Sequence, residues 1–189
     1  MAGHTGDVAR ARSGLSDPAP TVRATALGAL ERLGALADDE VADGLADDDP
    51  TVRRRAAELT AGRTAVALLP SLDDPDSSVV EMAAWAAGER EEVAAVDRLA
   101  RLAAVPDGHP DPLCREAAVA ALGSIGDAAG LAAVLAALDD KPAIRRRAAV
   151  ALAAFEGPSV EAALRRCLDD RDWQVRQVAE DLLSVDGAG

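Results

Sequence analysis

Residues 17–34 read DPAPTVRATALGALERLG, a stretch that joins an acidic turn, a proline and an alanine-rich run ending in glycine. Within the run, Val22, Ala26 and Leu30 recur every four residues, which places them on one face of an amphipathic helix. A closely similar stretch, KPAIRRRAAVALAAFEG, returns at residues 141–157. The return of one pattern along the chain indicates an internal repeat.

Six copies of this pattern are found when the chain is aligned on the apolar residue that opens each alanine-rich helix. The fourth residue after the opening is alanine in every copy, and arginine follows the opening residue in five of the six. Proline, which fits the first turn of a helix because it lacks an amide hydrogen, precedes most openings. The repeated unit is therefore a helix, an acidic turn and a second helix. The opening residues are Val22, Val52, Val79, Cys114, Ile144 and Val175, and the alanines are Ala26, Ala56, Ala83, Ala118, Ala148 and Ala179.

The repeat pattern predicts six helical pairs. A proline interrupts one of the first helices, at Pro70, where we expect a kink or a shortened helix. The first helices are expected at about 7–15, 38–46, 63–72, 93–104, 128–138 and 159–168, and the second at about 21–33, 51–61, 78–88, 113–125, 143–155 and 173–184.

Composition agrees with an all-helical class and limits the possible functions. Apolar residues make up 49% of the chain and aromatic residues only 2%, so the core must be built from Ala, Leu and Val. The formal net charge of −13 opposes binding to a phosphate backbone, and we expect no nucleic-acid partner. No apolar stretch approaches the ~20 residues of a membrane span, and the opening MAGHTGDVARAR lacks the apolar centre of a signal peptide. The prediction is a cytoplasmic protein without membrane contact.

Candidate groups for catalysis or metal binding are few. The only histidines are His4 and His109, and neither can be combined with a nucleophile or a carboxylate into a recognisable site. The cysteines Cys114 and Cys167 lack the paired spacing of a zinc site and stand where apolar residues are expected, so we interpret them as buried thiols. We therefore expect no catalytic residue, no metal and no cofactor.

The pattern D-x-x-x-x-V-R-x-x-A-x-x-A-L-G resembles HEAT repeats, and at about 30 residues per unit it is most similar to the short PBS-lyase HEAT-like class. The resemblance implies an all-α, right-handed α-α solenoid of about six HEAT-like helical pairs, forming a single domain over 1–189. It also implies that the recurrent aspartates and arginines bridge neighbouring repeats in a ladder along the turns. The ladder arginines would be Arg23, Arg53, Arg115, Arg145 and Arg176, and the repeats would span approximately 6–34, 35–62, 63–89, 90–126, 127–157 and 158–186.

Candidate binding residues are those by which the repeats differ. In HEAT-like arrays the second helices line the concave surface, and the second and sixth residues after each opening point away from the core. Trp85 holds a sixth position and is the candidate apolar anchor, because tryptophan is enriched among binding hot spots. The alternative is that Trp85 packs sideways as a core residue, and that the charged residues are simply solvated. The candidate partner-binding residues are Trp85, Arg54, Glu81, Glu116, Arg146 and Val150, with Arg55 and Arg147 on the same side.

The sequence thus favours a non-catalytic scaffold or adaptor that binds a protein partner through the concave face, as a monomer or weak oligomer. The alternative is a small-molecule or pigment-handling enzyme, or a lyase-like chaperone, that uses the same groove. The resemblance assigns the fold and leaves these functions open, because one fold serves many tasks.

Overall fold

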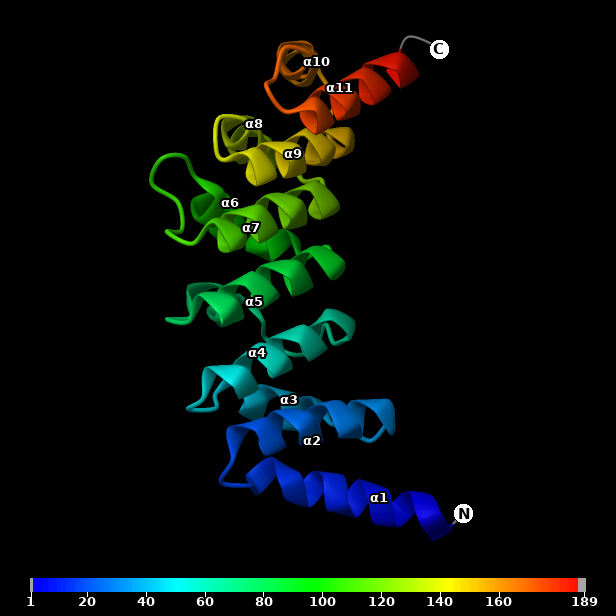
Figure 1. Cartoon of the computed structure of the whole chain (residues 1–189). Coiled ribbons are helices and arrows are strands. Elements are labelled where there is room, and N and C mark those ends of the chain that lie inside the picture. Colours follow the sequence, from blue (N-terminus) through cyan, green and yellow to red (C-terminus); the bar gives the residue numbers. More distant parts are fainter. Residues whose placement is uncertain (1, 187–189) are drawn as a thin grey trace. The chain divides into compact units, whose positions relative to one another are not determined.

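The computed structural model describes residues 2–186, and within them the side chains of residues 7–184. Over this range the chain consists of α-helices and short 3-10 turns joined by loops, with no strand, which confirms the predicted all-α class (Figure 1). The chain divides into two compact units, one ending at Ala86 and the other beginning at Ala87. The predicted single domain over 1–189 stays a prediction, and its ends, residue 1 and residues 187–189, lie outside the described part.

The first unit contains the first three repeats. Helix α1 contacts α2, and α4 contacts both α2 and α3, so helices of successive repeats pack against one another. Pro50 opens α4, and the Asp49 carboxylate accepts a hydrogen bond from the Thr51 amide at 2.8 Å, which caps the helix start. The elements are α1 (Ala2–Ser13), η1 (Gly14–Ser16), α2 (Pro20–Arg32), α3 (Asp38–Leu45), α4 (Pro50–Leu59), η2 (Thr60–Gly62), η3 (Leu69–Asp73) and the start of α5 (Ser77–Glu89).

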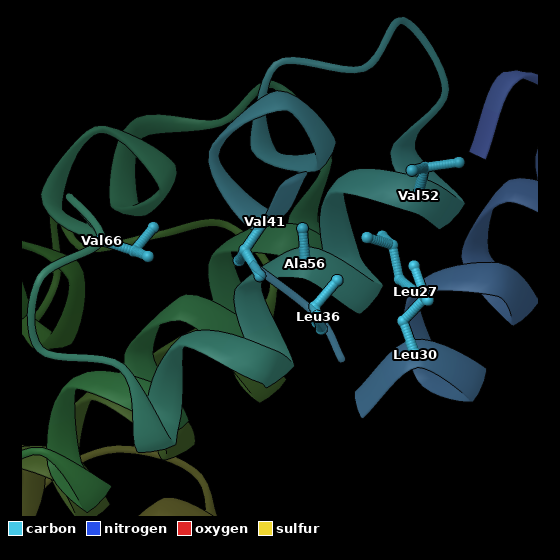
Figure 2. Packing of buried hydrophobic residues seen from close by; sticks show 7 residues of the cluster. All are labelled: Leu27, Leu30, Leu36, Val41, Val52, Ala56 and Val66. Carbon is cyan, nitrogen blue, oxygen red and sulfur yellow. The ribbon is translucent and has the colours of Figure 1, made fainter. Parts of the chain in front are cut away.

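The core of the first unit is a cluster of leucine, valine and alanine side chains that come from several helices. Two leucines of α2 meet a valine of α3 and residues of α4, and two further side chains come from the loops after α2 and α4 (Figure 2). No single helical pair supplies this set, so each pair buries its apolar face on its neighbour. The cluster consists of Leu27, Leu30, Leu36, Val41, Val52, Ala56 and Val66.

The second unit contains the last three repeats, built in the same way. Helix α7 contacts α6, α8 and α9, and α11 contacts α9 and α10. Pro112 opens α7, and the Asp111 carboxylate accepts a hydrogen bond from the Leu113 amide at 2.9 Å. The elements are η4 (Val93–Ala95), α6 (Val96–Ala103), α7 (Pro112–Ile125), η5 (Ala128–Gly130), α8 (Leu131–Ala137), α9 (Pro142–Ala151), η6 (Leu152–Ala154), α10 (Pro158–Cys167) and α11 (Trp173–Asp186).

The repeat alignment predicts the core well, with two corrections. All six repeat alanines are buried, at most 5% exposed, and so are five of the six opening residues. Val22 was expected in the core but is 41% exposed, because the neighbouring η1 places Gly14 beside it, a residue with no side chain to cover Val22. The first helix expected at 63–72 is shortened, as predicted for Pro70, but its bounds need correction: η3, a 3-10 helix over Leu69–Asp73, is the only helical element there. Pro70 has no amide hydrogen to extend a helix through this segment.

None of the helices within residues 2–186 combines the length and the apolar character needed to cross a membrane.

Candidate partner-binding surface

Four of the five predicted ladder arginines bridge neighbouring repeats, and we call these pairs the Arg–Asp ladder. Arg145 represents them: its Nε and Nη2 donate to the two carboxylate oxygens of Asp170, each at 2.9 Å, and its Nη1 donates to the carbonyl oxygen of Asp140 at 3.2 Å. Within each unit the ladder therefore joins one turn to the next, which is a structural role, as the resemblance implied. Its pairs are Arg23–Asp47, Arg53–Asp74, Arg115–Asp140 and Arg145–Asp170.

Arg176 departs from the ladder prediction. Its Nη1 donates only to carbonyl oxygens of its own turn, those of Asp170 and Arg171, and no carboxylate of the described chain pairs with it. In the second unit, the arginine hydrogen bonds of the ladder hold the pKa of Asp140 and of Asp170 below the ordinary value. These carboxylates are committed to the fold and are poor candidates for binding.

In the first unit, the exposed face of α5 carries Trp85. Trp85 is 42% exposed, which contradicts the alternative that it packs sideways as a core residue. Glu81 lies one turn earlier on the same helix and is partly exposed. Arg54 of α4 is exposed and makes no ion pair within the described residues. All three lie at the surface, as predicted, and their role in binding stays a prediction.

Arg55 of α4 lies against α2 of the preceding repeat. Arg55 pairs with Glu58 at 2.6 Å and lies over Gly28 of α2, so closely that a Cβ at position 28 would clash with its guanidinium. Gly28, which the helical register placed on the exposed face, is consequently buried. A long side chain from one repeat thus covers a gap left by a glycine in the repeat before it.

In the second unit, the exposed side of α7 and α9 forms a shallow groove, which we call the α7–α9 groove. Its volume is about 390 Å³. Val150 stands at the groove and is 49% exposed. Gly123 allows the two helices to approach closely, because a Cβ there would lie 2.9 Å from the Cα of Ala151. The lining residues are Ala120, Gly123, Ser124, Arg147, Val150, Ala151, Ala153 and Ala154.

The charged candidates of the second unit are partly engaged in contacts within the fold. Arg146 donates from Nε to the Asp172 carboxylate at 2.7 Å, so part of its hydrogen-bonding capacity is used within the fold. The Nη2 atom of Arg147 lies 3.6 Å from Oε1 of Glu116, a distance longer than a hydrogen bond. The guanidinium of Arg147 can therefore still bind other partners. Of the two arginines, Arg147 is therefore better placed to meet a ligand, although sequence reasoning preferred Arg146.

Two surface features were missed by sequence reasoning. Trp173, on the first turn of α11, is 64% exposed, and the signal available was that it replaces the proline found at this position in several repeats. A second groove, of about 1150 Å³, lies along α10 and the end of α11. Its apolar lining includes Phe155, Val160, Leu164, Leu168, Leu182 and Leu183. No short sequence motif predicts this groove, because its lining residues are separated in the sequence and come together only in the folded chain.

Within the described residues, the cysteines and the histidine considered for catalysis are buried or half-buried. Cys114 and Cys167 are buried as predicted, and burial raises the pKa of the Cys167 thiol. His109 is half-buried, and its Nδ1 accepts a hydrogen bond from the Asp111 amide at 3.1 Å. The side chain of His4 lies outside the described residues. Over the described residues, no three His, Cys, Asp or Glu side chains are grouped so that they could hold a metal ion.

Comparison with known proteins agrees with the repeat architecture. Residues 107–184, in the second unit, match the family model of HEAT repeats. No curated protein matches the chain.

Among solved structures, the chain shares the fold of armadillo and HEAT-like repeat solenoids. A designed armadillo repeat protein in complex with the peptide (KR)4 has a TM-score of 0.69 and 17% identity, over 94% of this chain and 98% of that one. An engineered protein has a TM-score of 0.68 and 20% identity, over 94% and 95%. The Escherichia coli protein YibA has a TM-score of 0.66 and 18% identity, over 96% of this chain and 72% of that one. At these identities the likeness concerns the fold alone.

Proposed function

We propose that this chain, whose residues 107–184 match the family model of HEAT repeats, is a non-catalytic scaffold that binds a segment of a partner protein on the exposed faces of its second helices. The single observation that carries the proposal is the exposure of large apolar side chains at a repeat position that faces away from the core. Trp85 occupies that position in the first unit and Val150 in the second. The fold is of a kind used for peptide binding, and one structural neighbour is a designed repeat protein in complex with a peptide.

The physical basis is the burial of apolar surface on a rigid support. A tryptophan side chain buries up to about 250 Å². The 42% of Trp85 that is exposed therefore amounts to about 100 Å², and covering it would contribute about 2.5 kcal/mol at about 25 cal/mol per Å². That is the range of a binding hot spot. Because α5 is already folded, little conformational entropy is lost when a partner binds there.

The α7–α9 groove offers a second contact in the other unit. Its floor of alanine and glycine leaves room for a partner side chain, and Arg147 at its edge can donate hydrogen bonds to a carboxylate or a carbonyl oxygen. We propose that the groove accepts one apolar side chain of the bound segment against Val150. Each surface acts within its own unit, and each is tested by its own variant.

The test is capture of a partner by the immobilised chain, followed by variants of both surfaces. We expect Trp85→Ala or Val150→Ala to reduce the amount of a specifically captured partner, with helical content unchanged by circular dichroism. Trp173→Ala is the matched control, because it removes an exposed tryptophan from a different part of the surface. Unchanged capture in both test variants, or an equal loss in the control, contradicts the proposal. Loss of turnover of a small molecule in Trp85→Ala, with capture unaffected, favours the enzymatic alternative.

A further inference from the structure

The exposed face of α5 combines an aromatic ring with a free carboxylate. Glu81 and Trp85 are four residues apart on one helix, a spacing at which side chains are neighbours. The Glu81 carboxylate has no hydrogen bond or ion pair within the described residues. Glu58 of α4 provides the contrast, since its carboxylate is already paired with Arg55 at 2.6 Å. Glu81 is therefore available to a ligand, and Glu58 is engaged.

The chemistry of this pair decides which partner side chain fits. The face of an indole ring attracts cations through its quadrupole, and a neighbouring carboxylate adds direct attraction between opposite charges. A purely apolar partner side chain would cover Trp85 but would also strip water from Glu81 without replacing its hydrogen bonds, which is costly. A cationic side chain can both cover the ring of Trp85 and replace the hydrogen bonds that the Glu81 carboxylate makes with water.

Resting on the proposed function, we infer that the Glu81–Trp85 face of α5 binds a lysine or arginine side chain of a basic segment in the partner. Arginine fits better than lysine, because its planar guanidinium stacks on an aromatic face while donating to a carboxylate. The formal net charge of −13 attracts basic segments and repels a second copy of this chain. On α4 the exposed Arg54 favours the opposite charge, so the inference concerns the side chain over α5 alone.

The experiment measures binding of a fluorescent (KR)4 peptide to the full chain by anisotropy, with an uncharged (GS)4 peptide as the reference. We expect (KR)4 to bind more tightly than (GS)4 at physiological ionic strength. Trp85→Leu, which keeps an apolar side chain but removes the aromatic face, should weaken (KR)4 binding about threefold or more. Glu81→Gln should also weaken it about threefold, and the loss should shrink as salt is added.

Two matched controls separate a specific site from general attraction to an acidic protein. Glu180→Gln removes one exposed negative charge elsewhere, and Trp173→Leu removes an exposed indole elsewhere. Both should change the dissociation constant by less than about 1.5-fold. Equal losses in tests and controls would show diffuse attraction and overturn the inference. So would a failure of (KR)4 to bind, or equal binding of (GS)4. If partner capture still depends on Trp85 in those cases, the proposed function stands and only the basic partner is refuted.

Discussion

Replacing Asp170 by asparagine is expected to destabilise the second unit by about 2 kcal/mol. Asp170 accepts hydrogen bonds from Nε and Nη2 of Arg145, each at 2.9 Å, and from the Asp172 amide at 2.8 Å. Asparagine keeps one acceptor oxygen, but its amide group cannot accept from Arg145 and the negative charge is lost. A hydrogen bond to a charged group contributes about 1.5–3 kcal/mol, and we take the lower part of that range because water reaches the pair.

Urea unfolding followed by circular dichroism measures this effect, together with Arg145→Met and the double variant. Because both single variants break the same pair, their effects should not add, and the double variant should be about 1 kcal/mol more stable than their sum predicts. Arg165→Met is the control: it breaks the exposed Arg165–Glu161 pair and should cost less than about 0.5 kcal/mol. A stability of Asp170→Asn within about 0.5 kcal/mol of the parent, or strictly additive effects, would refute the structural role of the ladder.

Three further predictions concern the stability of the fold at low pH, the glycine that ends α7, and the reactivity of the Cys167 thiol. The arginine partners lower the folded-state pKa values of Asp140 and Asp170. The stability that these carboxylates provide is therefore present above the unfolded pKa of about 4 and is lost as the pH falls through the folded-state pKa. The urea concentration at the unfolding midpoint should decrease when the pH is lowered from about 5 to about 3, and an unchanged midpoint would contradict this prediction. Gly126 ends α7 with φ of 66°, so Gly126→Ala should cost about 1 kcal/mol in urea unfolding, whereas Gly62→Ala, with open space around its Cβ, should cost nothing measurable. Burial raises the pKa of Cys167, and its thiol should react with a disulfide reagent at least about tenfold more slowly in the native protein than in urea; comparable rates would show that the site is open.

The helical repeat could be predicted from the sequence because its causes are local. Proline at a helix start and apolar residues four apart act within a few residues of each other, so Pro50 and Pro112 mark helices at the expected places. The segment around Pro70 shows the limit of such reasoning: the sequence predicted a kinked or shortened helix over 63–72, but not that only the 3-10 helix Leu69–Asp73 would form there. The exposure of Trp85 and Val150 also followed from the helical register.

What the sequence by itself determined is therefore where most of the helices lie and which of their faces are apolar; the resemblance to HEAT repeats added the arginines and aspartates that can join repeats. Only the tertiary structure decided that Arg55 covers Gly28, that Arg146 is held by Asp172, and that α7 and α9 enclose a groove. Each of these contacts joins residues of different repeats, and its length depends on how closely two helices approach. That approach is set by the side chains packed between the helices, which no local pattern specifies.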